Sequence, residues 1–328
     1  MARRVGRDHG PLTMSVGAVA GLPAWLRWTW VVPAAFLLVF LVYPLVVLGV
    51  TVGGEAGLLT PLLAPELWRV TGLAVLQAAV STLVALIVGL PLANVVSRYR
   101  FRGRALAQAL VTVPFVLPTV VVALAIRILV GPGVPQGFLI VVLAHAYVNL
   151  AVVARIVGAQ WAQHSGDVES VARTLGATRW RAFLDVTLPS LRSSIASAAA
   201  VVFVFSFTSL GIVLLLGDPW TRTLESQILR QTSVLLDFPA AAATALVQLL
   251  VVSAVLILGA VAARRAPARR VRPVALRALP ARPLARFAVI GTAAGGCVLV
   301  LAPVVALVIA SLRTEQGWSA AWWTSLGS

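Results

Sequence analysis

The chain has 328 residues, of which 60% are hydrophobic and 11% are charged, and its formal net charge is +16. Soluble domains usually carry about 25% charged residues, so this composition excludes an ordinary soluble protein. All the basic residues in that charge are arginines, and most lie in the segments between alternate apolar runs. This asymmetry is the positive-inside pattern of a membrane protein, and it argues against a nucleic-acid-binding surface.

Seven charge-free apolar runs recur along the chain, and each exceeds the roughly 20 residues that a helix needs to cross a bilayer. Because a spanning segment must satisfy its own backbone hydrogen bonds, runs of this length are expected to be helices. The predicted fold is therefore all-α, a polytopic transmembrane helical bundle. The predicted spans cover residues 28–52, 70–96, 105–130, 138–157, 194–216, 241–263 and 287–312.

The domain organisation follows from these runs. The arginines predict a cytoplasmic N-terminus and contact with anionic membrane lipid, and the first apolar run is too long for a removable signal peptide. The lone Cys297 cannot form a disulfide within one chain. We expect a basic cytoplasmic tail (1–27), a six-span domain (28–263), a basic cytoplasmic linker (264–286) and a seventh span that begins an incomplete second group (287–328).

The third predicted span carries Thr112, Pro114, Pro118 and Thr119. Prolines within a membrane helix either kink it or unwind it locally, and an unwound stretch can expose carbonyl groups to a translocation path. A packing kink is the favoured interpretation, and local unwinding is the alternative. Thr112 and Thr119 are candidate path residues.

Two polar residues of the fourth span, His145 and Asn149, lie four positions apart and so share one helix face. Polar groups at membrane depth often mark a substrate path, but they also form hydrogen bonds between neighbouring helices. Both interpretations remain open for this pair. Among the other ionisable groups, no carboxylate lies inside a predicted span.

Residues 160–192 form a mixed-charge segment that is too polar to span. Asp167 is a suitable N-cap for a short helix whose apolar residues recur at helical spacing from Val168 to Leu175, and Gly176 is placed to end it. Thr178 can cap a second short helix. The segment therefore predicts two short helices at a sharp angle outside the membrane, with Pro189 starting the approach to the fifth span. An amphipathic loop resting on the bilayer is the alternative.

The residues of this segment resemble the EAA signature of binding-protein-dependent ABC transporter permeases. Gly176, Val186 and the pair Leu188–Pro189 stand at the spacing of that signature. Ser170 and Val171 replace its Glu and first Ala, and the acid stands one place earlier, at Glu169. The resemblance implies that the segment docks on an ATPase. The expected coupling residues are Glu169, Ser170, Val171, Ala172, Arg173, Leu175, Gly176, Ala177, Val186, Leu188 and Pro189.

Further stretches are similar to the ferric-iron and thiamine permease group. They are residues 143–149 with Arg155, residues 214–219, residues 223–225 and the Ala-rich stretch that ends at Gln248. Members of that group usually fuse two six-span halves, each with its own EAA loop. This chain is therefore expected to match the first half and the start of the second, either as a fragment or as a subunit that needs a partner.

The resemblance implies the multi-pass permease subunit of an importer in the bacterial cell membrane, carrying ferric iron or thiamine. The implied partners are a cytoplasmic ABC ATPase dimer, an extracytoplasmic solute-binding protein and a second permease half. The chain has no lysine and so cannot carry a standard P-loop. No catalytic residue, metal site or cofactor is expected. The rivals are an ion-coupled secondary transporter or channel, which would need intramembrane carboxylates, and an intramembrane enzyme.

Overall fold

The computed structural model describes residues 28–53, 58–163, 167–264, 276–314, 317–319 and 323. The chain divides into two units, residues 1–57 and residues 58–328. The first unit contains helix α1 (Val31–Gly53), which coincides with the first predicted span. The predicted tail, residues 1–27, and residues 265–275 of the predicted linker lie outside the described residues.

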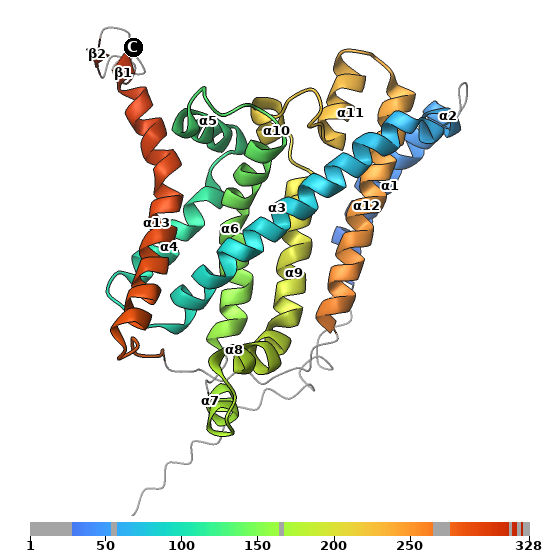
Figure 1. The fold of residues 1–328 in the computed structure, drawn as a ribbon. Helices are drawn as coiled ribbons and strands as arrows, with labels where there is room; N and C mark the ends of the chain where they lie inside the picture. The colour runs from blue at the N-terminus through green and yellow to red at the C-terminus, as the bar shows by residue number, and fades with distance from the viewer. Residues whose placement is uncertain are drawn as a thin grey trace, which may run out of the picture. The chain divides into compact units, whose positions relative to one another are not determined.

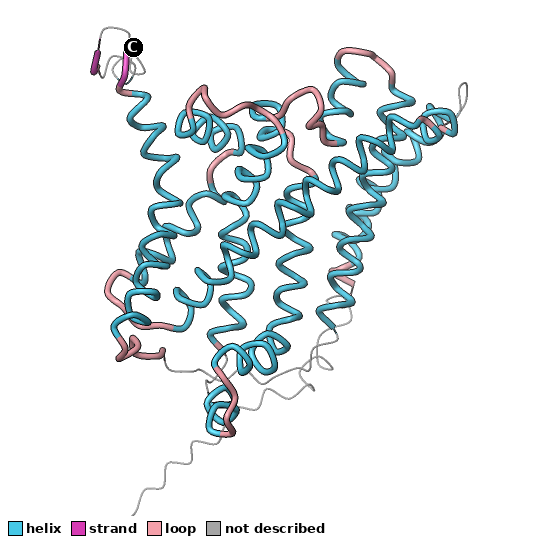
Figure 2. The backbone as a smooth tube through the Cα atoms, in the orientation of Figure 1, coloured by secondary structure: helices cyan, strands magenta, loops and turns pink. Residues whose placement is uncertain are grey.

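The second unit is built almost entirely of helices, as Figure 2 shows. Its only strands among the described residues, β1 (Arg313–Thr314) and β2 (Gly317–Trp318), pair antiparallel near the C-terminus. The helices are, in chain order, α2 (Leu59–Leu63), α3 (Pro65–Arg98), α4 (Arg104–Val116), α5 (Thr119–Val130), α6 (Phe138–Ala162), α7 (Asp167–Thr174), α8 (Arg179–Ala182), the π-helix η3 (Phe183–Thr187), α9 (Leu188–Phe207), α10 (Gly211–Leu216), α11 (Leu224–Ser233), α12 (Phe238–Arg264) and α13 (Pro283–Ser311).

Five helical stretches in the described residues are long and apolar enough to cross a membrane. They are α3, α6, the run from α8 to α9, α12 and α13, and the bent pair α4–α5 would make a sixth. The predicted transmembrane helical bundle is therefore confirmed. The count of seven spans stays a prediction, because α1 qualifies over Val31–Phe40 only as a shorter apolar helix.

The third predicted span is broken, and the packing kink favoured from its sequence is wrong. α4 and α5 are bent by 106° relative to each other. Leu117, the residue before Pro118, has an extended backbone with ψ of 139°. Proline disfavours the helical conformation of its predecessor, and Pro118 itself has no amide hydrogen to continue the helix. Thr119 then begins α5 as a separate helix.

The fifth predicted span, residues 194–216, is wrong at both ends. Its helix begins upstream, because α8, η3 and α9 form one continuous run from Arg179 to Phe207. The wider π-helical turn precedes Pro189 in the first turn of α9, where a missing amide hydrogen is tolerated. The helix then stops at Phe207 and resumes as α10. A Cβ added at Gly211 would lie 2.6 Å from Thr119 Oγ1, so this glycine lets α10 pack closely on the start of α5.

Small residues let α3, α6 and α9 approach one another at the centre of the second unit (Figure 1). A Cβ added at Gly89 of α3 would lie 2.7 Å from Val153 Cγ1 of α6. Ala85, Ala93 and Ala198 are fully buried in the same cluster. This close packing fixes the registers of the helices that carry the polar residues described below.

α13 packs against the preceding helices of the second unit. It contacts α3, α4 and α5, and it lies beside α4 in Figure 1. Tyr147 Oη of α6 donates a hydrogen bond of 2.8 Å to the Val300 carbonyl. A Cβ at Gly296 would lie 2.6 Å from Leu92 Cδ1, so α13 also fits closely against α3.

Candidate functional site

Helix α7 lies at the lower end of Figure 1, close to the ends of α3 and α6. It stops in a Schellman arrangement: the Gly176 amide donates to the Arg173 carbonyl at 3.1 Å, and the Ala177 amide donates to the Ala172 carbonyl at 3.0 Å. Gly176 has a φ of +92°, the left-handed conformation that this cap requires. The predicted helix end at Gly176 is therefore confirmed.

The apolar face of α7 is not covered by the described part of the chain. Leu175 at its end is 82% exposed, and Val171 is 56% exposed. Arg173 and Ser170 are also exposed, whereas Ala172 and Ala177 are half-buried. The side chain of Val168, the remaining apolar position, lies outside the described residues. A short helix with large aliphatic side chains facing outward is a surface suited to a partner protein.

The second part of the segment is fixed to α6 by aromatic stacking. Thr178 Oγ1 accepts a hydrogen bond of 3.2 Å from the Arg181 amide and so caps α8, as predicted. Phe183 of η3 stacks on Trp161 of α6, with ring centroids 6.3 Å apart, and on Trp180 at 5.8 Å. The predicted separate second helix does not form, because α8 continues into α9.

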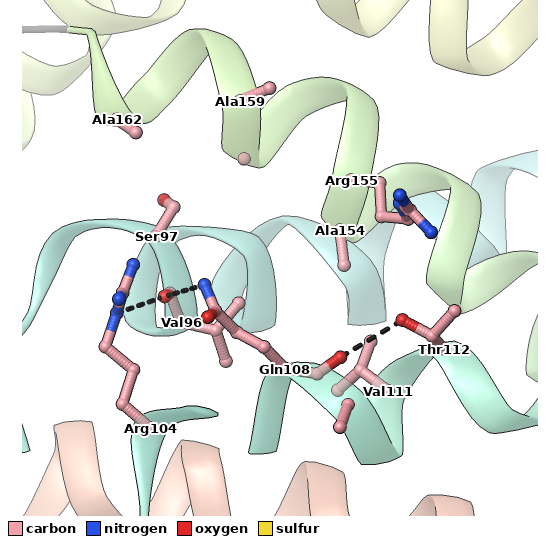
Figure 3. A pocket seen from close by; sticks show the side chains of 12 residues that line it. Val96, Ser97, Arg104, Gln108, Val111, Thr112, Ala154, Arg155, Ala159 and Ala162 are labelled. Carbon is pink, nitrogen blue, oxygen red and sulfur yellow. Dashed lines mark hydrogen bonds between the residues drawn. The ribbon is translucent and has the colours of Figure 1, made fainter. Parts of the chain in front are cut away.

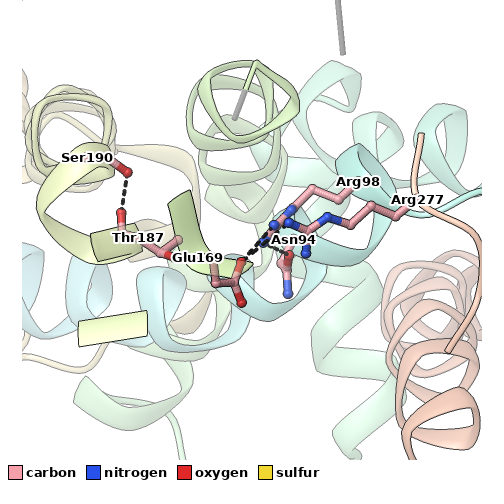
Figure 4. A network of polar contacts seen from close by, with 6 residues as sticks. All are labelled: Asn94, Arg98, Glu169, Thr187, Ser190 and Arg277. Carbon is pink, nitrogen blue, oxygen red and sulfur yellow. Dashed lines mark hydrogen bonds and ion pairs between the residues drawn. The ribbon is translucent and has the colours of Figure 1, made fainter. Parts of the chain in front are cut away.

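The other signature residues lie where this continuous helix begins. Val186 is half-buried in η3, and Leu188 and Pro189 open α9, with Leu188 half-buried and Pro189 exposed. Ser190 Oγ donates to the Thr187 carbonyl at 2.6 Å (Figure 4). The signature therefore spans a capped surface helix and the start of a membrane helix.

Glu169 of α7 points toward the membrane helices (Figure 4). Its Oε2 accepts from Arg98 Nη2 at 3.1 Å and from Arg277 Nη2 at 3.4 Å. Arg98 ends α3, is 8% exposed, and its Cζ lies 5.9 Å from the Trp161 ring centroid. Sequence reasoning missed both arginines, because their sequence separations from Glu169 give no local signal.

His145 and Asn149 lie in a buried polar cluster between α3, α6 and α9. Gln77 Nε2 lies 2.7 Å from His145 Nδ1 and donates to Ser81 Oγ at 2.8 Å. Asn149 Nδ2 donates to the His145 carbonyl at 2.9 Å and to Ser206 Oγ at 3.3 Å. His145 and Asn149 are each 1% exposed. The cluster joins three helices, and the path role of these two residues stays a prediction.

The polar cluster consists of Gln77, Ser81, His145, Asn149 and Ser206. Three of its side-chain atoms could form further hydrogen bonds. Gln77 Oε1, His145 Nε2 and Asn149 Oδ1 are buried without a hydrogen-bond partner among the described residues. Buried polar atoms of this kind are costly and are usually paired with protein or water. Across the described residues, no group of three or more His, Cys, Asp or Glu side chains could hold a metal ion.

A cavity of about 440 Å³ lies between the ends of α3 and α6 and the start of α4 (Figure 3). Arg104 Nε and Gln108 Nε2 both donate to the Val96 carbonyl, at 2.9 and 3.0 Å. Thr112 and Arg155 also line this cavity, and none of its lining residues in the described part of the chain is a carboxylate. Thr119 does not line it and is exposed at the start of α5. The four predicted path residues therefore lie in three separate places: Thr112 in this cavity, Thr119 at the start of α5, and His145 with Asn149 in the buried polar cluster.

Three of the residues similar to the iron and thiamine group, Asp218, Glu225 and Gln248, form structural contacts in the loop after α10 and between α11 and α12. Asp218 Oδ1 accepts from the Thr221 amide and hydroxyl, each at 2.7 Å, and the hydroxyl bond lowers the pKa of this carboxyl. Gln248 Nε2 of α12 donates to Glu225 Oε1 of α11 at 3.2 Å, while burial raises the pKa of Glu225. The first contact orders the loop after α10, and the second ties α11 to α12.

Comparisons with known proteins agree with this architecture. Residues 83–267 match the family of binding-protein-dependent transport system inner membrane components. A molybdate/tungstate transport system permease protein of Thermococcus kodakarensis is 30% identical over 183 residues, which are 56% of this chain and 74% of that protein. The sulfate transport system permease protein of Escherichia coli is 30% identical over 196 residues, 55% of this chain and 71% of that protein.

Two further proteins, a thiamine permease and an alginate importer, are also similar to this chain. The thiamine transport system permease protein of Escherichia coli is 30% identical over 200 residues, 56% of this chain but 37% of that protein. A bacterial ABC transporter involved in the import of alginate has the same fold, with a TM-score of 0.59 and 18% identity, over 74% of this chain and 96% of that chain. The chain therefore belongs to the family of inner membrane components of binding-protein-dependent transport systems, as an importer permease subunit.

Proposed function

We propose that a separate cytoplasmic ATPase dimer docks on residues 167–189 and drives this permease. The observation that carries this proposal is the exposed apolar face of α7, Val171 with Leu175, on a helix whose end is fixed by Gly176. An uncovered apolar surface outside the membrane spans is costly unless a partner buries it. The lack of any lysine supports an ATPase on another chain, since the P-loop lysine must come from elsewhere.

The orientation follows from the arginines. Residues 98–104 and 264–286 are rich in arginine, and residues 98–104 lie at the same end as α7 in Figure 1. Positive residues favour the cytoplasmic side, so this end and the N-terminus face the cytoplasm. An extracytoplasmic binding protein then delivers solute at the end that carries α11.

The proposed solute is a tetrahedral oxyanion of the molybdate and sulfate class. Support comes from the two relatives described as molybdate/tungstate and sulfate permeases, which this chain matches over most of their length. Arg104 and Arg155 line the cavity between α3, α4 and α6, where the described lining residues include no carboxylate, and they fit an anionic solute. Thiamine is the second candidate, on its relative's 30% identity. Ferric iron, also expected from the sequence, has no support among these relatives.

The translocation path is proposed to form between two permease halves. Thr112 of the cavity between α3, α4 and α6, Thr119 at the broken helix, and the buried His145 and Asn149 remain its candidate residues. A second six-span half, of which residues 287–328 are the proposed start, would complete the path. The ion-coupled transporter is not favoured, since the family match is to binding-protein-dependent transport systems and the predicted spans contain no carboxylate.

The test is capture of a candidate ATPase. The chain and the ATPase are co-expressed and copurified, with and without the double substitution Ala172→Glu and Gly176→Glu. The matched control places two glutamates on the exposed end of α11, Ser233→Glu and Val234→Glu. Capture lost only in the first variant supports docking on α7. Capture by no ATPase, or equal capture by both variants, overturns the proposal.

A further inference from the structure

Helix α7 has two faces with different chemistry. At roughly 100° per residue, Val171 and Leu175 lie about 200° and 240° around the helix from Glu169. The apolar side chains face outward, whereas Glu169 is 27% exposed and faces α3 and the segment before α13. One helix therefore offers an apolar surface to a partner and an anionic contact to its own permease.

The anionic contact is shared by two distant parts of the chain. Arg98 at the end of α3 and Arg277 before α13 approach the same oxygen, Glu169 Oε2, at 3.1 and 3.4 Å (Figure 4). Arg98 also contacts Asn94 Oδ1 at 3.4 Å and lies over the Trp161 ring. Because Trp161 stacks on Phe183, Arg98 contacts both α7 and the aromatic stack that anchors η3.

The backbone holds Arg277 in place independently of its side chain. The Arg277 amide donates to the Arg98 carbonyl at 2.8 Å, and the Arg100 amide donates to the Arg277 carbonyl at 2.9 Å. The segment thus runs parallel beside Tyr99. α13 begins shortly afterwards, at Pro283, and packs on α3, α4 and α5. A displacement of α7 therefore has a short physical connection to α13.

We propose that Glu169, Arg98 and Arg277 form an ion-pair junction that transmits the movement of α7 to α3 and α13, with Arg277 as a positioning residue for this coupling. The proposal rests on the proposed docking of an ATPase on α7. Glu169 then acts within the permease, and the outward face of α7 binds the motor. The connection reaches α13 without passing through the membrane interior.

Arg277 is the position at which the junction can be tested. Arg98 is 8% exposed, so removal of its partner Glu169 would leave a buried charge and destabilise the fold. The side chain of Arg277 is 32% exposed, and its backbone hydrogen bonds survive a substitution. Arg282 is a matched control, because it is an exposed arginine of the same segment that forms no ion pair among the described residues.

The experiment uses the full complex of the chain, its ATPase and its binding protein in proteoliposomes. Solute uptake per ATP hydrolysed is compared for the unmodified chain, Arg277→Gln, Arg277→Lys and Arg282→Gln, with ATPase capture measured in parallel. We expect Arg277→Gln to keep full capture and to lower uptake per ATP about threefold to fivefold, the size expected for a partly exposed ion pair. Arg277→Lys should restore at least half of that loss, and Arg282→Gln should match the unmodified chain.

The outcomes separate the two proposals. The junction is overturned if Arg277→Gln and Arg282→Gln give the same uptake per ATP. It is also overturned if Arg277→Lys lowers uptake per ATP as much as Arg277→Gln does. An unmodified chain that captures no ATPase overturns the docking proposal and the junction with it. Full capture with a selective coupling loss at Arg277, rescued by lysine, supports both.

Discussion

The buried polar cluster and helix α7 differ in which side chains are buried: the cluster buries polar side chains, whereas α7 exposes apolar ones. Between α3, α6 and α9, Gln77, His145 and Asn149 turn polar groups toward neighbouring helices and are almost fully buried. On α7, the aliphatic side chains of Val171 and Leu175 are exposed. In lipid, polar contacts can join helices, whereas an exposed apolar face in water requires a partner. The comparison therefore predicts stability effects in the first region and binding effects in the second.

The largest stability effect is expected at the helix crossing that supports the polar cluster. Gly89→Ala places a Cβ 2.7 Å from the buried Val153, and such overpacking costs about 1–3 kcal/mol in the free energy of unfolding. Gly72→Ala in the same helix meets no atom within 4 Å, so it should stabilise by about 0.5–1 kcal/mol. Thermal unfolding in detergent measures both. Equal shifts for the two glycines would contradict close packing at Gly89.

A smaller effect is expected from the polar contact itself. Gln77→Met leaves the buried His145 Nδ1 without its partner and should destabilise by about 1–2 kcal/mol, the cost of an unsatisfied buried polar group. Gln77→Met combined with His145→Leu removes both partners and should recover most of that loss.

A double-mutant cycle of unfolding free energies, with solute uptake measured in parallel, checks this pair. Additive losses would show that the contact contributes nothing. A recovered stability with lost uptake would support the path role of His145, whereas normal uptake would leave only the joining of helices.

In helix α7 the expected effect is local. Gly176→Ala meets no atom within 4 Å, so its cost is the left-handed backbone alone, about 1–2 kcal/mol. Hydrogen exchange at the amides of Gly176 and Ala177 should become about fivefold faster or more, while exchange in α6 stays unchanged. Gly133→Ala, at another open glycine without positive φ, is the control. Unchanged exchange at residues 176–177 would show that the cap does not depend on glycine.

The smallest stability effect is expected at the exposed end of α7. Leu175→Ser should change the free energy of unfolding by less than about 0.5 kcal/mol, as surface substitutions usually do. The same change should weaken ATPase capture about tenfold, since a buried interface leucine contributes about 1–2 kcal/mol. Leu235→Ser, which alters an exposed leucine after α11, should leave capture unchanged. Equal capture by both variants would remove the distinction between the two regions.

Local chemistry explains what could be predicted from the sequence. The apolar length of α3, α6, α12 and α13 is sufficient to identify spans, because membrane thickness sets that length. The left-handed Gly176 and the Thr178 cap are also local, since each depends on neighbouring backbone groups. Thr223 caps the short helix α11 through contacts of the same local kind.

The sequence-based predictions were wrong where the outcome depends on contacts between residues that are distant in the sequence. Pro114 and Pro118 mark the third span as irregular, but the 106° bend depends on how α5 packs against α10 and α13. The continuation of α8 through η3 into α9 could not be predicted either, since Pro189 suggests a break in isolation. In the structure Phe183 stacks on Trp161 of α6, and the run stays helical through η3 into α9.

The sequence alone determined that this protein is a helical membrane protein with a capped, amphipathic segment between two spans, because apolar length, arginine distribution and capping residues act over short distances. The permease class was implied by the resemblance of that segment to the EAA signature. The tertiary structure decided which residues meet. Glu169 contacts Arg98 and Arg277, and Gln77 contacts His145, across long separations in sequence. Such contacts depend on how whole helices pack, and the close approach of α3 and α6 at Gly89 is what sets that packing.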